Sequence, residues 1–172
     1  MTAVNWTHRV GEIGERPLEV ERKALPSELP AVANELDVPS CEALSARYTI
    51  RPLGRGRYML TGKAEATVTQ SCVITLEPIT SSVSDAFEIE FWPPDDLPGA
   101  VSADAIEAFG PDEPEAIVNG VIDVGVIILD SLSGAIDRYP RKPGAVFSWV
   151  DKKADADSDN PFAKLKGFGR QS

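Results

Sequence analysis

Apolar and polar residues alternate along much of the first half of the chain, and this period of two is typical of half-buried β-strands. Leu18 and Val20, for example, alternate with Glu19 and Glu21. On this basis strands are predicted at residues 5–13 and 16–23, joined at Gly14-Glu15, and at residues 45–53, 57–70, 71–79 and 84–92. The turn Gly54-Arg55-Gly56 favours a hairpin between the third and fourth segments, and their close spacing predicts an antiparallel meander.

Two segments switch to the helical period of 3.6 residues. The first, residues 26–38, has Ser27 as a candidate N-cap and an apolar stripe formed by Leu29, Val32, Ala33 and Leu36. The second, residues 123–137, has Asp123 as a candidate N-cap and a broad apolar face formed by Val126, Ile127, Leu129, Leu132 and Ile136. Between the strands and this second helix, the Pro-rich and base-free residues 93–116 predict a long surface loop.

The order of these segments is not the regular alternation of strand and helix that builds a parallel sheet. It predicts an α+β fold: an antiparallel meander sheet, which could close into a barrel, packed by one long C-terminal helix and one short N-terminal helix. Residues 1–150 are expected to form a single α+β domain. Residues 151–172 are expected to be a flexible linker followed by a docking tail with the sequence NPFAKLKGF.

Charge is distributed unevenly along this chain, whose net charge is -10. Residues 64–137 contain 15 Asp and Glu and no Lys or Arg, whereas residues 43–63 contain five bases and no acid. Residues 138–172 hold eight bases and four acids. A net negative charge disfavours broad binding to nucleic acid, but two basic islands on either side of an acidic middle indicate a local surface for a polyanion.

Residues that could carry catalysis are few. His8 is the only histidine, and Cys41 and Cys72 are too far apart and too isolated to predict a zinc site. Cys72, which alternates with Ile74 and Leu76, is interpreted as a buried thiol on a strand. The pair Asp95-Asp96 on the Pro-rich loop is expected to be solvated. No enzyme, cofactor, metal or small-molecule substrate is therefore expected.

The chain contains no run of apolar residues long enough for a membrane span and no secretory signal, so no membrane partner and a cytoplasmic location are expected.

Three segments carry a resemblance: QSCVITLEPI at residues 70–79, DVGVIILDSLSGAIDRYPRKPGAVF at residues 123–147 and NPFAKLKGF at residues 160–168. Together, in this order, they resemble the YceD family of small bacterial proteins, which has relatives in plastids. The resemblance implies a non-enzymatic factor that supports accumulation or processing of large-subunit (23S-type) ribosomal RNA. Many family members carry further cysteines near the first segment and after the main helix. This chain has none there, which indicates a Cys-poor branch of the alphaproteobacterial kind.

These observations lead to a functional hypothesis with two alternatives. In the first, the chain binds large-subunit ribosomal RNA or its precursor particle through Arg55, Arg57, Lys63, Arg141, Lys142, Lys164, Lys166 and Arg170. In the second, it is a protein–protein adaptor for a basic ribosomal or assembly protein. The residues predicted to contact a protein partner are Asp95 and Asp96 on the acidic loop, with Phe162 and Leu165 of the tail.

Overall fold

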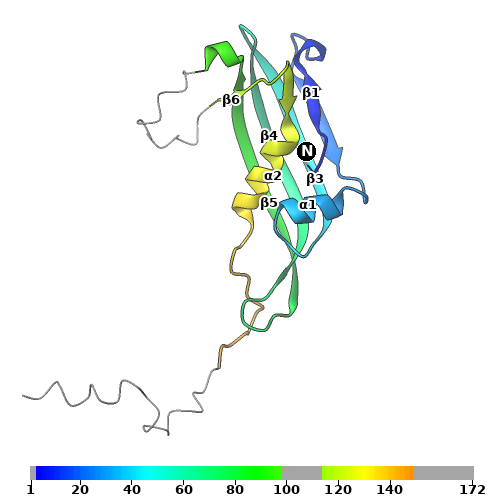
Figure 1. Cartoon of the computed structure of the whole chain (residues 1–172), viewed down its shortest axis with the longest axis vertical. Coiled ribbons are helices and arrows are strands. Elements are labelled where there is room, and N and C mark those ends of the chain that lie inside the picture. The colour runs from blue at the N-terminus through cyan, green and yellow to red at the C-terminus, as the bar shows by residue number, and fades with distance from the viewer. Residues whose placement is uncertain (1–2, 98–113, 149–172) are drawn as a thin grey trace, which may run out of the picture. The chain divides into compact units, whose positions relative to one another are not determined.

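The computed structural model describes residues 3–97 and 114–148 (Figure 1). They form an α+β fold with a mostly antiparallel sheet and two helices, as predicted. The strands are β1 (Thr7–Arg9), β2 (Leu18–Lys23), β3 (Ser40–Gly54), β4 (Arg57–Ser71), β5 (Pro78–Trp92), β6 (Glu115–Ala116) and β7 (Val121–Asp123). The helices are α1 (Leu29–Glu35) and α2 (Val124–Ala135), with short 3-10 helices η1 (Val10–Glu12) and η2 (Pro94–Asp96). All of these elements lie in a compact unit that spans Met1–Lys142, and a second unit spans Pro143–Ser172.

The main sheet has five strands in the order β2-β3-β4-β5-β6. Strands β2 to β5 are consecutive in the chain and pair antiparallel, which confirms the predicted meander. Only β6 runs parallel to its neighbour, along the last two residues of β5. Within the described residues the sheet is open and does not close into a barrel, since its two end strands, β2 and β6, do not pair with each other.

The turn at the β3–β4 hairpin lies where the sequence predicts it. Gly54, Arg55 and Gly56 all have positive φ (86°, 54° and 74°), a conformation that glycine adopts without steric cost. The hairpin register is symmetric about this turn, so that Arg47 lies opposite Lys63 and Arg51 opposite Met59.

Two strand predictions were wrong. Residues 72–77 form the turn between β4 and β5 rather than part of a strand, because two strands of 15 residues each must reverse direction there. Leu76 adopts φ 60° in that turn and is largely exposed, so its alternation with Cys72 does not reflect burial on one face. At the N-terminus, the strand predicted at residues 5–13 is reduced to β1 (Thr7–Arg9), which pairs with β7 and is followed directly by η1.

Helix α2 packs against β4 and β5 and supplies much of the core (Figure 1). Asp123 is its N-cap, as predicted, and its side chain accepts the backbone N–H of Val126 at 3.3 Å. Ile127, Leu129, Leu132 and Ile136 are buried as predicted, and so are Val124 and Ile128. Val126 is the exception, with 39% of its surface exposed. Helical geometry explains this, because Val126 is two residues from both Val124 and Ile128 and so points away from the face that they share.

Helix α1 is shorter than the segment that predicted it. It begins after Glu28 rather than Ser27, and Glu28 makes no side-chain cap to the helix. Val32, Ala33 and Leu36 are buried, and the helix packs against β3. No helix of the described residues has the length and apolar character needed to cross a membrane.

Candidate nucleic-acid interface

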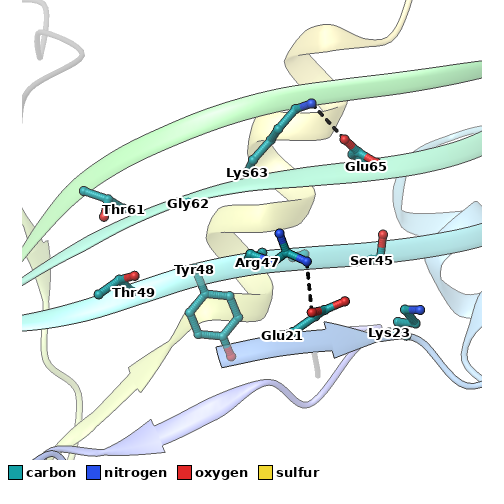
Figure 2. Close-up of a pocket in the computed structure, with 11 residues that line it drawn as sticks. Glu21, Lys23, Ser45, Arg47, Tyr48, Thr49, Thr61, Gly62, Lys63 and Glu65 are labelled. Carbon is teal, nitrogen blue, oxygen red and sulfur yellow. Dashed lines mark hydrogen bonds and ion pairs between the residues drawn. The ribbon is translucent and has the colours of Figure 1, made fainter. Parts of the chain in front are cut away.

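The main sheet has one buried face and one face that α2 does not cover. Successive side chains of a strand point to opposite faces, and Leu44, Ala46, Tyr48 and Ile50 of β3 are all buried. The residues between them therefore point the other way: Ser45, Arg47, Thr49 and Arg51. We call this side the outer face; in Figure 2 it carries most of the labelled side chains, and α2 lies behind the sheet.

A depression of about 620 Å³ lies across β2, β3 and β4 on the outer face (Figure 2). Among the residues that line it are three bases, two acids and three Ser or Thr residues: Lys23, Arg47, Lys63, Glu21, Glu65, Ser45, Thr49 and Thr61. The bases exceed the acids by one, in a chain whose net charge is -10. We call this depression the outer groove.

The bases of the outer groove are exposed and loosely paired. Arg47 contacts Glu21 at 3.1 Å, and Lys63 contacts Glu65 at 2.8 Å, with every one of these side chains more than half exposed. The bond from Lys63 holds the pKa of Glu65 below its usual value. Exposed ion pairs contribute only about 0–1 kcal/mol each, so an incoming phosphate can replace the glutamates as the partner of either base.

Arg47 and Lys63 also lie directly opposite each other in the β3–β4 pairing. Like charges in that relation destabilise a sheet, and the exposed contacts with Glu21 and Glu65 offset only part of that cost. An anion bound between them would relieve the repulsion. This is the feature of the outer face that points most directly to a polyanion.

At the tip of the β3–β4 hairpin, the two predicted RNA contacts differ. Arg55 is exposed at the turn. Arg57, in contrast, stacks on the ring of Trp92 at 3.9 Å and donates two bonds to Asp96 Oδ2 at 3.1 and 3.0 Å. Asp96 is exposed, as expected of a loop carboxylate, but the sequence did not predict its ion pair with this guanidinium.

Of the second basic island, Lys142 lies at the other end of β4. Lys142 bonds Glu77 at 2.9 Å, beside the turn that connects β4 to β5. Strand β4 has 15 residues, and at about 3.3 Å per residue its two ends are roughly 45–50 Å apart. The structure therefore brings Arg55 and Lys63 onto one hairpin and places Lys142 far from the hairpin tip. Lys164, Lys166, Arg170, Phe162 and Leu165 lie outside the described residues, as does most of the loop 93–116.

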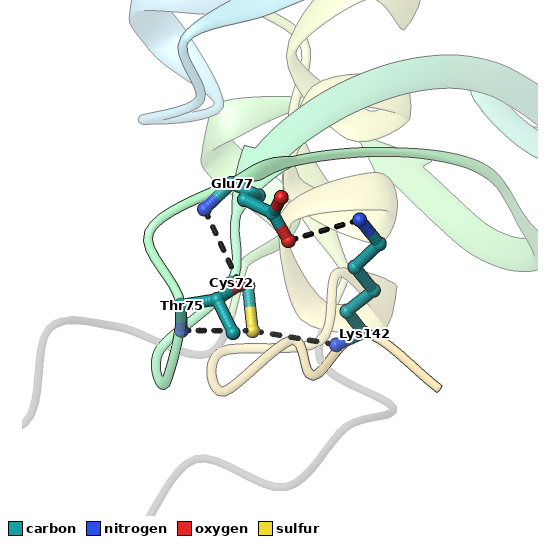
Figure 3. Close-up of polar contacts among 4 residues, drawn as sticks. All are labelled: Cys72, Thr75, Glu77 and Lys142. Carbon is teal, nitrogen blue, oxygen red and sulfur yellow. Dashed lines mark hydrogen bonds and ion pairs between the residues drawn. The ribbon is translucent and has the colours of Figure 1, made fainter. Parts of the chain in front are cut away.

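The turn at residues 72–77 surrounds the Cys72 sulfur with hydrogen-bond donors (Figure 3). The backbone N–H groups of Lys142 and Thr75 each point at Sγ from 3.4 Å, and the thiol itself is fully buried, as predicted. Donation from Lys142, and then from Thr75, lowers the pKa of Cys72 to about 6, although burial opposes this change. Figure 3 also shows Glu77, whose carboxylate accepts a bond from Lys142 Nζ at 2.9 Å and whose backbone N–H donates to Thr75 Oγ1 at 3.4 Å.

His8 and Tyr48 form a polar contact that the sequence did not predict. His8 Nε2 lies 2.8 Å from the hydroxyl of Tyr48, and burial, followed by the charge of Arg22, lowers the pKa of His8.

Within residues 3–97 and 114–148, no three His, Cys, Asp or Glu side chains gather closely enough to hold a metal ion.

Arg47 and Lys23 are the two bases of the outer groove that were not among the RNA contacts predicted from the sequence. The sequence does contain a signal for Arg47. Arg47 and Lys63 are equally far along the chain from Arg55 at the centre of the turn, so a symmetric hairpin pairs them. For Lys23 no such signal exists, since its place depends on how β2 pairs with β3.

The fold and this face define a small α+β protein with a five-stranded sheet, one side of which carries a cluster of exposed bases. Comparison of the chain with protein-family models, with curated proteins and with solved structures finds no match.

Proposed function

We propose that this chain is a non-enzymatic ribosome-biogenesis factor of the bacterial cytoplasm. It would support accumulation or processing of large-subunit ribosomal RNA by binding that RNA, or a precursor particle, through the outer face of the β3–β4 hairpin. The observation that carries the proposal is the exposed pair Arg47 and Lys63, opposed across the hairpin in an otherwise acidic chain. The resemblance of three sequence segments to the YceD family supplies the class of RNA.

Four exposed bases follow the outer side of the hairpin from the outer groove to the turn: Arg47, Lys63, Arg51 and Arg55. Arg51 and Arg55 make no ion pair within the part of the chain that the structure describes. Guanidinium groups that are already free of carboxylates can bind phosphate without first breaking a contact. Arg57, Arg141 and Lys142 would add contacts where the RNA reaches either end of β4.

The number of phosphates contacted sets the salt dependence of binding. Each contact contributes about -0.7 to the slope of log K against log salt for a single strand, and about -0.9 for a duplex. Contacts from these four bases predict slopes of about -2.8 and about -3.6 respectively. The acidic residues elsewhere in the chain repel the same RNA, so binding should be confined to low and moderate salt.

The test uses the double variant Arg51→Gln with Arg55→Gln and an in vitro transcript of large-subunit ribosomal RNA. Fluorescence anisotropy at several salt concentrations should show weaker binding and a slope shallower by about 1.4 to 1.8. The matched control is Arg9→Gln with Arg16→Gln, which removes the same charge from exposed residues outside the hairpin. Absence of binding by the wild-type protein at low salt, or an equal loss in the control, would contradict direct RNA contact.

The adaptor hypothesis predicts a different pattern. It requires the exposed acid Asp95, whereas Asp96 is already bonded to Arg57. Asp95→Lys is therefore the informative variant, since Asp96→Lys would also disturb the hairpin tip. Sedimentation of tagged protein from lysate, combined with RNA crosslinking, separates the two functions: loss of particle association in Asp95→Lys without any crosslink to RNA would favour the adaptor.

A further inference from the structure

Most of one edge of strand β5 has no strand beside it in the part of the chain that the structure describes. The strand runs from Pro78 to Trp92 and pairs with β4 from Pro78 to Phe91. On its other side, β6 pairs with Phe91 and Trp92 alone. Figure 1 shows β5 at the border of the sheet. The backbone from Ile79 to Glu90 therefore offers N–H and C=O groups to an added strand.

The β5 edge lacks the features that normally prevent such pairing. Protected edges are short, or carry Lys, Pro, a bulge or an inward-pointing charge. The opposite edge, β2, has only six residues, four of them charged. Residues 79–90 of β5 contain no Lys, Arg or Pro, and the pairing of β5 with β4 shows no bulge. The one inward charge, Asp85, is bonded to Ser131 Oγ of α2 at 2.6 Å and so does not keep another strand away.

The side chains along the β5 edge indicate what kind of strand would fit. On the outer face, Ser82 and Ser84 are small and uncharged, and Glu88 and Glu90 follow them. No base occurs anywhere in residues 64–137. An added strand with Lys or Arg on the outer face would place opposite charges across from Glu88 and Glu90, which stabilises paired strands. A second copy of this chain would instead bring together two molecules that each carry a net charge of -10.

We propose that β5 is a docking edge for an extended basic segment of a partner protein, which adds a strand along residues 82–90. The partner's backbone supplies hydrogen bonds to β5, and its alternate basic side chains pair with Glu88 and Glu90. This interaction goes beyond the proposed function, because it involves no RNA and uses none of the bases of the outer groove. It also places a protein partner on the sheet edge rather than on the loop acids Asp95 and Asp96.

The experiment uses a synthetic peptide that alternates Val with Lys and is long enough to pair with residues 82–90. A second peptide has the same sequence, but alternate backbone nitrogens are methylated, so that its charge is kept and strand pairing is blocked. Affinity is measured by anisotropy, and hydrogen exchange reports protection of the β5 amides. The protein variant Glu88→Lys removes the charge match, and Glu19→Lys is its control because it makes the same change at an exposed position of the β2 edge.

Strand addition predicts that the first peptide binds and protects the amides of residues 82–90, and that methylation abolishes both effects. Glu88→Lys should weaken binding about threefold to tenfold, in line with cross-strand charge pairs, and Glu19→Lys should not. Equal affinity for both peptides would show simple charge attraction and would overturn the proposal. The proposal would also be overturned if the amides of residues 82–90 are protected in the protein alone. That result would count whether the protein is a monomer or forms a dimer as its concentration rises.

Discussion

Gly62 lies in the middle of β4, and replacing it with Ala should destabilise the fold. An added Cβ would lie 2.6 Å from Tyr48 Cβ, 2.8 Å from Arg47 O and 2.8 Å from Phe87 Cζ. All three distances are shorter than any ordinary carbon contact. Tyr48 and Phe87 are buried, and Tyr48 is bonded to His8, so neither ring can turn away into solvent. Arg47 O belongs to the paired backbone of β3, so the sheet itself must shift.

The size of the effect follows from two opposing contributions. Overpacking of a core costs about 1–3 kcal/mol, and a contact with backbone favours the upper part of this range. Replacing Gly by Ala also reduces the entropy of the unfolded chain, which offsets about 0.4–1 kcal/mol. The free energy of unfolding should therefore fall by about 2 kcal/mol. For a chain of this size the melting temperature should drop by about 4–8 °C.

Urea unfolding followed by circular dichroism measures this change, and an unaltered slope would show that only stability has changed. Gly14→Ala is the matched control, because no atom lies within 4 Å of its added Cβ. The control should be as stable as the wild-type protein or slightly more stable. If Gly62→Ala unfolds at the wild-type urea concentration, the close packing of Tyr48 and Phe87 around Gly62 is refuted.

Three further predictions concern the core and the perturbed groups. Leu132→Ala should cost about 2–5 kcal/mol in urea unfolding, whereas Val126→Ala, on the exposed side of α2, should cost less than about 1 kcal/mol; equal costs would contradict the packing of α2. Folding lowers the pKa of His8 from 6.5, so the native state favours the neutral ring. The free energy of unfolding should therefore decrease as pH falls below about 6.5, and His8→Gln should remove this part of its pH dependence. Folding lowers the pKa of Cys72 from 9.0 to about 6, so the stability that the thiolate contributes should be fully present above pH 9 and be lost as pH falls through about 6. Thiolate absorbance should disappear over the same lower range. A thiol that titrates only near 9, or a Cys72→Ser variant with the wild-type pH profile of stability, would contradict this prediction.

The parts of the fold that depend on near neighbours could be predicted from the sequence. The Gly54-Arg55-Gly56 turn determines the register of β3 and β4, and the N-cap at Asp123 marks the start of α2. Both are local signals in which residue type and backbone conformation are directly linked. The same register predicts which bases of the hairpin are exposed, because successive side chains of a strand point to opposite faces of the sheet.

Contacts between distant segments could not be predicted in this way. Arg57 and Asp96 are 39 residues apart, and β1 pairs with β7 across most of the chain. Neither the ion pair of Asp96 nor the partner strand of β1 leaves a signal in the local pattern of residues. The turn at residues 72–77 misled the pattern for another reason: Val73 and Leu76 are apolar but exposed, so hydrophobicity there does not report burial.

Only strand β5 separates the outer groove from the β5 edge. Ligands bound at these two sites should therefore change each other's affinity. Thr61 on β4 lies next to Glu88, and Met59 lies next to Glu90, so both acids stand beside the path proposed for RNA along the hairpin. In the protein alone these carboxylates repel phosphate. Basic side chains of an added strand would neutralise them and would extend the basic surface from β4 across β5. RNA and the basic peptide should therefore each bind more tightly in the presence of the other, by the same factor, since coupling between two binding sites is reciprocal.

Titration of the protein with RNA, with and without saturating peptide, measures that factor. The coupling should disappear at high salt and in the Glu88→Lys protein, and competition between the two ligands would show instead that they share one site.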